Sequence, residues 1–148
     1  MEGLRSIVLL AAALLLLPDD ARAERTVVLV TGKECPVTEL SSLDVRKAYL
    51  GVAVRVDGYR LTPIQFVGDD LLSQVFYQSI VSMSRKSYER RALSLAIKYG
   101  TPRPLKAESS ADVAEAIEEY QCGIVYLWKE DADQLATVRT VRTLWQGE

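Results

Sequence analysis

The sequence predicts a single domain of the α/β class, in which the strands of a small sheet alternate with helices. Apolar, β-branched runs alternate along the chain with segments whose apolar residues recur every three or four positions. The 148 residues are 49% hydrophobic and 26% charged, which is the composition and length of one globular domain. No repeat and no low-complexity linker divides the sequence into halves.

The first 23 residues have the order of a secretory signal peptide. Arg5 precedes an apolar run of about a dozen residues, and Pro18 and a small-x-small triplet follow the run. A membrane anchor is the alternative, but the run is shorter than the roughly 20 residues that span a bilayer. We therefore expect cleavage after Ala23, a periplasmic domain at 24–148, and no membrane span in the mature chain.

The first part of the mature chain predicts a strand and a short helix. The β-branched run 26–31, ended by Gly32, is typical of a strand that is buried on both faces. The motif S-x-x-D at 41–44 is a helix-capping signal, and the apolar positions after it predict a helix that stops at Gly51. The turn dipeptide Asp57-Gly58 then predicts a reversal of the chain.

A second strand and an amphipathic helix follow. Residues 61–66 predict the strand, and Pro63 places it at a sheet edge or at its own start, because proline cannot donate to a ladder. Asp69 and Asp70 lie at the N-terminus of the helix, where negative charge favours the helix dipole. Helical spacing defines the stripe that faces the core: Leu72, Val75, Phe76, Ser79 and Ile80.

Two further helices and two strands complete the prediction. Ser84 caps a helix that Gly100 ends, and a second S-x-x-D motif at 109–112 opens another helix. Residues 124–128 predict a buried strand, and 138–144 predict a last one. The first of these helices is expected to turn one side inward: Tyr88, Ala92, Leu95, Ala96 and Tyr99. Its other side is expected to be solvated: Arg85, Lys86, Arg90 and Arg91.

Composition excludes several classes of function. There is no histidine, so histidine-dependent catalytic triads, imidazole zinc sites and histidine pH switches are excluded. The net charge of −2 gives no general attraction to nucleic acid. Neighbouring carboxylates such as Asp69 and Asp70 point to different faces of a helix and form no acid/base pair, and no metal-binding loop spacing occurs. We expect a protein that is not an enzyme and has no cofactor or metal.

The two cysteines, Cys35 and Cys122, remain in the mature chain. In an oxidising compartment an even cysteine count predicts pairing, and two cysteines allow only one connectivity. Two buried, inert thiols are the alternative. The absence of a C-x-x-C pair argues against an oxidoreductase.

Four sequence landmarks resemble those of phosphate-type periplasmic substrate-binding proteins in order and spacing. They are LDVRKAYLG at 43–51, Pro63-Ile64, Phe76-Tyr77 before Met83-Ser84, and CGIVY at 122–126. The resemblance covers roughly 26–128. It implies a type 2 periplasmic-binding-protein-like sandwich with a small, mostly parallel sheet flanked by helices. Full-length members have two lobes that close over the ligand, so the resemblance implies a short member with a single lobe.

The resemblance also implies where a ligand would bind. Family members hold phosphate at a turn rich in Ser, Gly and Thr, at the N-terminus of the helix after the second strand. Here Phe66 stands where the family has its binding arginine, and two carboxylates, Asp69 and Asp70, occupy the turn and would repel an oxyanion. After the first strand, residues 31–33 could present backbone amides and a cation, although an ordinary turn is the alternative.

Two functions therefore stay open at the level of the sequence. The first is binding of a small solute or anion at an altered site. Its candidate residues are Thr31, Gly32, Lys33, Gly68, Asp69, Asp70 and Ser73. The second is an interaction module without a ligand, which docks to a protein partner in the periplasmic envelope or in a transport complex.

Overall fold

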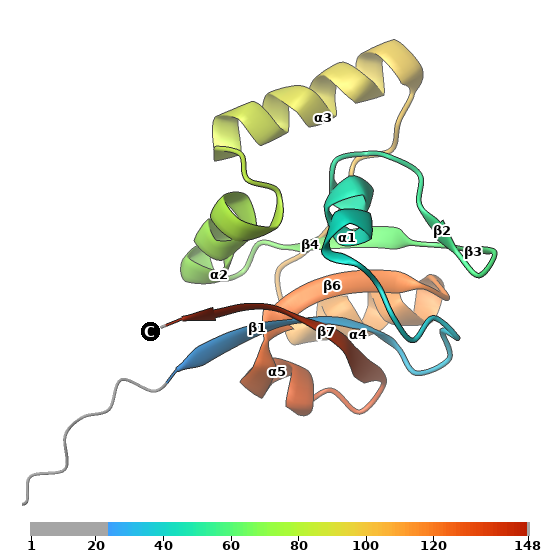
Figure 1. The fold of residues 1–148 in the computed structure, drawn as a ribbon, viewed down its shortest axis with the longest axis vertical. Coiled ribbons are helices and arrows are strands. Elements are labelled where there is room, and N and C mark those ends of the chain that lie inside the picture. The colour runs from blue at the N-terminus through green and yellow to red at the C-terminus, as the bar shows by residue number, and fades with distance from the viewer. Residues whose placement is uncertain (1–23, 148) are drawn as a thin grey trace, which may run out of the picture.

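The computed structural model describes residues 24–147, so the predicted signal peptide lies outside the described residues. Its centre is a five-stranded sheet with the order β5-β4-β6-β1-β7 (Figure 1). The strands are β1 (Arg25–Gly32), β4 (Thr62–Phe66), β5 (Leu105–Ala107), β6 (Gly123–Trp128) and β7 (Val138–Gly147). Because β4 is parallel to β5 and β6, whereas β1 is antiparallel to β6 and β7, four strands share one direction and β1 opposes them. The predicted mostly parallel sheet is confirmed.

Helices cover both faces of this sheet, as the α/β prediction requires. The helical elements are α1 (Ser42–Tyr49), α2 (Asp70–Val75), the π-helical turn η1 (Phe76–Ile80), α3 (Arg85–Tyr99), α4 (Ser110–Glu119) and α5 (Lys129–Asp133). Side chains of α1, α2 and η1 pack on one face of β1 and β6, and those of α4 and α5 pack on the other. A small hairpin, β2 (Arg55–Val56) and β3 (Tyr59–Arg60), turns at Asp57-Gly58 as predicted.

The predicted caps explain where the main helices begin and end. The hydroxyls of Ser41, Ser84 and Ser109 each accept a hydrogen bond from a backbone N–H three residues later, at the starts of α1, α3 and α4. Gly100 ends α3 in the left-handed region, with φ 65°, which a glycine adopts without strain. The boundaries of these helices follow from local sequence signals.

Three expectations differ from the structure. Ser79 is expected in the stripe that faces the core and is instead exposed. Pro63 lies near the start of its strand, which is one of its two expected placements, while β4 is an inner strand between β5 and β6 and not an edge strand. The helix predicted after Asp69 changes at Phe76 into the wider turn η1. Tyr99 was expected to face inward and is instead 76% exposed, because α3 extends beyond the sheet. No pattern in the sequence predicted the short elements β5 and α5.

Cys35 and Cys122 form the predicted disulfide. It joins the loop after β1 to the residue before β6, with the two Cα atoms 5.1 Å apart, and both side chains are buried. The cross-link therefore ties together two chain segments that are 87 residues apart in sequence.

Within the part of the chain that the structure describes, no helix is long and apolar enough to cross a membrane.

Candidate functional site

The candidate site lies along the edge of the sheet that is formed by the C-terminal ends of β4, β5 and β6. Each of these neighbouring strands leads into a helix: β4 into α2, β5 into α4, and β6 into α5. Ligands of open α/β sheets bind outside the carboxyl ends of the strands. Helix N-termini gather there, and their free N–H groups attract anions. The edge therefore brings the N-termini of α2, α4 and α5 together.

Asp69 occupies the start of α2 with both of its carboxylate oxygens engaged. Its Oδ1 accepts a hydrogen bond from the backbone N–H of Leu72 at 2.8 Å. Its Oδ2 accepts one from the indole Nε1–H of Trp128, the last residue of β6, at 3.0 Å. Both donors are thus occupied by a carboxylate of the chain itself, because Asp69 is the N-cap residue of α2.

The surroundings of Asp69 favour its ionised form. Partial burial opposes ionisation, but the hydrogen bonds from Leu72 and Trp128 and the nearby charge of Arg25 together lower the pKa of Asp69 below its ordinary value. Arg25 itself lies over the Trp128 ring, with its guanidinium carbon 3.6 Å from the ring centroid. Asp69, Trp128 and Arg25 form a compact group of anion, donor and cation.

The turn between β5 and α4 packs closely against the residues that precede α2. Gly68 approaches the Glu108 carbonyl so closely that a Cβ atom there would collide with it, and the N–H of Val67 donates to the Ala107 carbonyl at 2.8 Å. Asp112 accepts a hydrogen bond from the Glu108 N–H at 2.9 Å. A backbone N–H group just before α4 is therefore also occupied by a carboxylate of the protein itself, that of Asp112.

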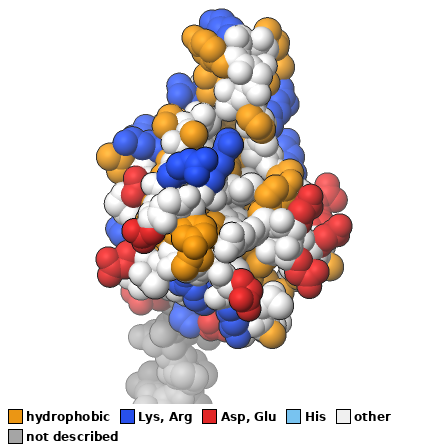
Figure 2. All heavy atoms as spheres, turned by 90° about the vertical axis from the view of Figure 1, so that its right-hand side faces the viewer, with side chains coloured by type: hydrophobic (Ala, Val, Ile, Leu, Met, Phe, Trp, Pro, Cys, Tyr) orange, Lys and Arg blue, Asp and Glu red, His pale blue; other side chains and the backbone are white. Residues whose placement is uncertain are grey.

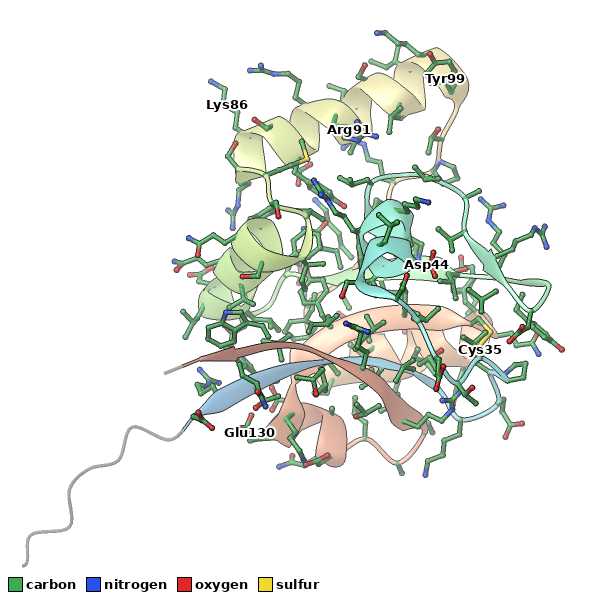
Figure 3. The ribbon with its side chains drawn as sticks, in the orientation of Figure 1. Cys35, Asp44, Lys86, Arg91, Tyr99 and Glu130 are labelled. Atoms are coloured by element: carbon green, nitrogen blue, oxygen red, sulfur yellow. A yellow bond between two sulfur atoms is a disulfide. The ribbon has the colours of Figure 1, made fainter. Side chains whose placement is uncertain are left out.

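Among the other predicted residues of α2, Asp70 adds a second carboxylate and Ser73 adds one hydroxyl group. Asp70 is exposed in the first turn, and the buried Ser73 uses its N–H in the helical bond to the Asp69 carbonyl. Glu130 is the second residue of the neighbouring helix α5 and is labelled in Figure 3. The carboxylates that α2, α4 and α5 carry in their first turns make this edge negative: Asp70, Asp112, Glu130 and Asp131. The cations nearby are Arg25 and Lys129, of which Lys129 pairs with Asp133, so the excess of carboxylates opposes the approach of a phosphate ion.

Tyr126 strengthens the core directly behind this edge. Its hydroxyl donates to the Phe66 carbonyl, at the end of β4, at 3.2 Å. Burial raises the pKa of Tyr126 far above its ordinary value, so the phenol stays neutral and keeps its proton for this bond.

Thr31, Gly32 and Lys33 lie at the opposite end of the sheet. The Thr31 hydroxyl donates to the Gly123 carbonyl at 2.7 Å, and the Lys33 N–H donates to the Thr137 carbonyl at 3.0 Å, so both groups are used internally. Gly32 packs against Ile117 of α4. A hollow of about 550 Å³ near Lys33 is also lined by carboxylates: Glu34, Glu118 and Glu119. The two sets of predicted binding residues therefore cannot contact one small ligand together.

Two residues of the Asp69 group were not among the sequence candidates. Trp128 looked like part of a buried strand, and Arg25 preceded the first apolar run without any motif around it. Both meet Asp69 because β1 starts where β6 ends, with Val27 opposite Trp128. Only the sheet topology reveals this juxtaposition. Among residues 24–147, the acidic residues and cysteines form no cluster that could hold a metal ion.

Comparison with solved structures places the fold among phosphate-type substrate-binding proteins. A phosphate ABC transporter substrate-binding protein of Clostridium perfringens, solved with bound phosphate, aligns with a TM-score of 0.59 at 14% identity, over 80% of this chain and 45% of that protein. The PstS protein of Borrelia burgdorferi aligns with a TM-score of 0.51 at 10% identity, over 74% and 43%. An ABC-type phosphate transport receptor of Vibrio cholerae gives 0.50 at 12%, over 80% and 46%.

These similarities confirm the predicted periplasmic-binding-protein-like fold. The chain spans less than half the length of each of these proteins. No protein-family model matches the sequence, and no curated protein matches it.

Proposed function

We propose that this chain is a periplasmic, non-catalytic protein-binding domain with the fold of phosphate-type substrate-binding proteins. In this domain an internal carboxylate has replaced the bound anion. The observation that carries the proposal is the double engagement of Asp69 by the Leu72 N–H and the Trp128 indole. A site whose donors are already filled does not capture phosphate without first displacing its own side chain.

The solved neighbours make anion binding the competing function. One of them was solved with bound phosphate, and its fold is similar to that of this chain. Phosphate binding here would have to separate Asp69 from two hydrogen bonds and place a dianion beside several carboxylates, which costs free energy in both steps. Loss of ligand capture with retention of the fold leaves protein docking as the function that this fold can still perform.

Thermal unfolding in the presence of solutes separates the two functions. We expect the melting temperature of the oxidised chain 24–148 to be unchanged by millimolar phosphate, sulfate or small organic anions at constant ionic strength. A true ligand at a hundredfold excess over its dissociation constant would add about 2.7 kcal/mol, which amounts to several degrees in a domain of this size. Sodium chloride at matched ionic strength is the control. A saturable rise with any one of these compounds would overturn the proposed function.

A further inference from the structure

Helix α3 exposes large apolar side chains at its C-terminal end. It crosses one end of the molecule, away from the sheet (Figure 1), and Tyr88 is its one buried residue. Its C-terminal half mixes apolar residues with Ser94 and Lys98, and it exposes Leu93 by 47%, Ile97 by 75% and Tyr99 by 76%. Exposed large apolar side chains that gather among polar residues mark interaction sites. This end of α3 is therefore a candidate contact surface.

The helix is nevertheless held firmly at its base. The Tyr88 hydroxyl donates to the Tyr49 carbonyl at 2.8 Å, and the Arg91 Nε–H donates to the Leu50 carbonyl at 3.2 Å. Figure 3 shows Arg91 on the side of α3 that faces α1, while Lys86 points away from the body of the protein. These bonds anchor α3 to the end of α1. The exposed C-terminal end of α3 therefore has a fixed position relative to the rest of the protein.

A groove of about 600 Å³ runs beneath the exposed end of α3. Its walls come from the end of α1, the start of β4 and the loop that connects α3 to β5. Apolar and aromatic side chains form much of its lining, including Val52, Pro63, Tyr99 and Tyr120. The charged residues among those that line it are Arg60 and Arg103, and no carboxylate is among them. The groove thus combines apolar walls with positive charge.

The surrounding surface has the same sign of charge. Residues 85–106 carry seven basic side chains and one acidic one, Glu89, which lies 3.7 Å from the Lys106 ammonium. The basic residues are Arg85, Lys86, Arg90, Arg91, Lys98, Arg103 and Lys106. Figure 2 shows blue and orange side chains over the upper part of this face, whereas red side chains gather lower down. The positive charge is therefore concentrated around the groove and α3.

We propose that the groove between α1, β4 and the α3–β5 loop binds a segment of a partner protein that carries both apolar side chains and carboxylates. This inference rests on the proposed protein-binding function and names the surface and the partner chemistry. Apolar side chains of the segment would cover Tyr99 and the groove walls, and its carboxylates would face Arg60 and Arg103. Complementary charge of this kind accelerates association and selects the partner.

Other occupants fit the groove less well. A second copy that packed α3 against α3 would bring the basic residues of both chains together, and like charges oppose such contact. A second copy that offered the carboxylates of its α4, such as Glu118 and Glu119, would make a head-to-tail contact, which forms rings or open polymers and no symmetric dimer. A bilayer is too flat to fill a concave groove. A partner segment of complementary charge meets none of these objections.

Photo-crosslinking in the cells that make the protein tests this inference. Variants of the full chain carry a photoreactive phenylalanine derivative in place of Tyr99 in the groove, or in place of Leu43 or Leu71, which are exposed apolar residues on α1 and α2. We expect the Tyr99 position to form an adduct with another protein, and mass spectrometry to show a crosslinked segment that is acidic and apolar.

Arg60→Glu combined with Arg103→Glu should lower the adduct yield at least tenfold. Lys86→Glu combined with Arg90→Glu, a double charge reversal on α3 at residues that do not line the groove, should leave it unchanged.

The outcomes distinguish this inference from the function on which it rests. A protein adduct at Leu43 or Leu71 but not at Tyr99 would contradict binding in the groove and would leave the proposed protein-binding function intact. An adduct of Tyr99 with phospholipid, with a second copy of the chain, or with a protein segment that lacks carboxylates would also contradict the proposed partner segment in the groove. Absence of protein adducts at all three positions would contradict protein binding itself. All substituted residues are exposed, and thermal unfolding of each purified variant verifies that it is folded.

Discussion

Replacing Cys35 and Cys122 together with alanine is expected to lower the free energy of unfolding by about 4.5 kcal/mol or slightly more. The disulfide closes a loop across 87 positions of sequence, and the chain-entropy model assigns a stabilisation of this size to such a loop. That is a large share of the 5–15 kcal/mol typical of a natural domain. Denaturant unfolding of the oxidised wild type and the double variant, at neutral pH, measures the difference.

Wild-type protein in a reducing agent is the matched control for this variant. Reduction keeps both sulfur atoms in the core, so its effect reports the cross-link alone, whereas the double variant also loses buried volume. The reducing agent should destabilise the wild type and leave the double variant unchanged. Equal unfolding midpoints for oxidised and reduced wild type would show that the bond is not formed or does not stabilise the fold.

Phe76→Ala is expected to destabilise the domain by about 3–5 kcal/mol. Phe76 is completely buried where α2 passes into η1, and its ring stacks on Tyr126 with the centroids 4.6 Å apart. Its edges also meet the rings of Tyr49, Tyr77 and Tyr88. Truncation leaves a cavity in the middle of this aromatic cluster. Denaturant unfolding followed by circular dichroism gives the change.

Leu71→Ala is the matched control on the same helix. Leu71 is 48% exposed, so its truncation should change the free energy of unfolding by no more than about 0.5 kcal/mol. Comparable losses for both variants would mean that α2 does not bury the face that the structure assigns to the core.

Local signals in the sequence determine much of this fold. The serine caps before α1, α3 and α4, the glycine after α3 and the β-branched run of β1 all predicted their elements, because each signal acts within a few residues. The disulfide followed from the number of cysteines and the expected compartment. The family resemblance added the mostly parallel sheet that the structural neighbours confirm.

What the sequence did not predict depends on contacts between distant segments. Pro63 gave no indication that β4 would be flanked by two strands, since β5 has only three residues and no pattern of its own. The burial of Tyr99 was wrongly expected because a helical stripe shows which residues share a face and not whether anything covers that face. Residues 31–33 and 68–73 were grouped by their chemistry, and only the direction of β1 separates them. The pairing of Asp69 with Trp128 has the same origin.

Whether Asp69 acts as an internal anion can be measured directly by nuclear magnetic resonance. The carbon-13 signal of its carboxyl group is followed against pH, with and without millimolar phosphate. We expect a pKa below the ordinary value of 3.8, so the carboxylate stabilises the folded chain at neutral pH and this contribution is lost as the pH falls through the folded-state pKa.

Trp128→Phe is the control variant, because it removes the indole donor and should raise the pKa of Asp69 while the Leu72 hydrogen bond remains. The predicted result for the wild type is a lowered pKa that phosphate does not change. A pKa at or above 3.8, or an Asp69 carboxyl signal that shifts when phosphate is added at neutral pH, would contradict the internal replacement of a bound anion.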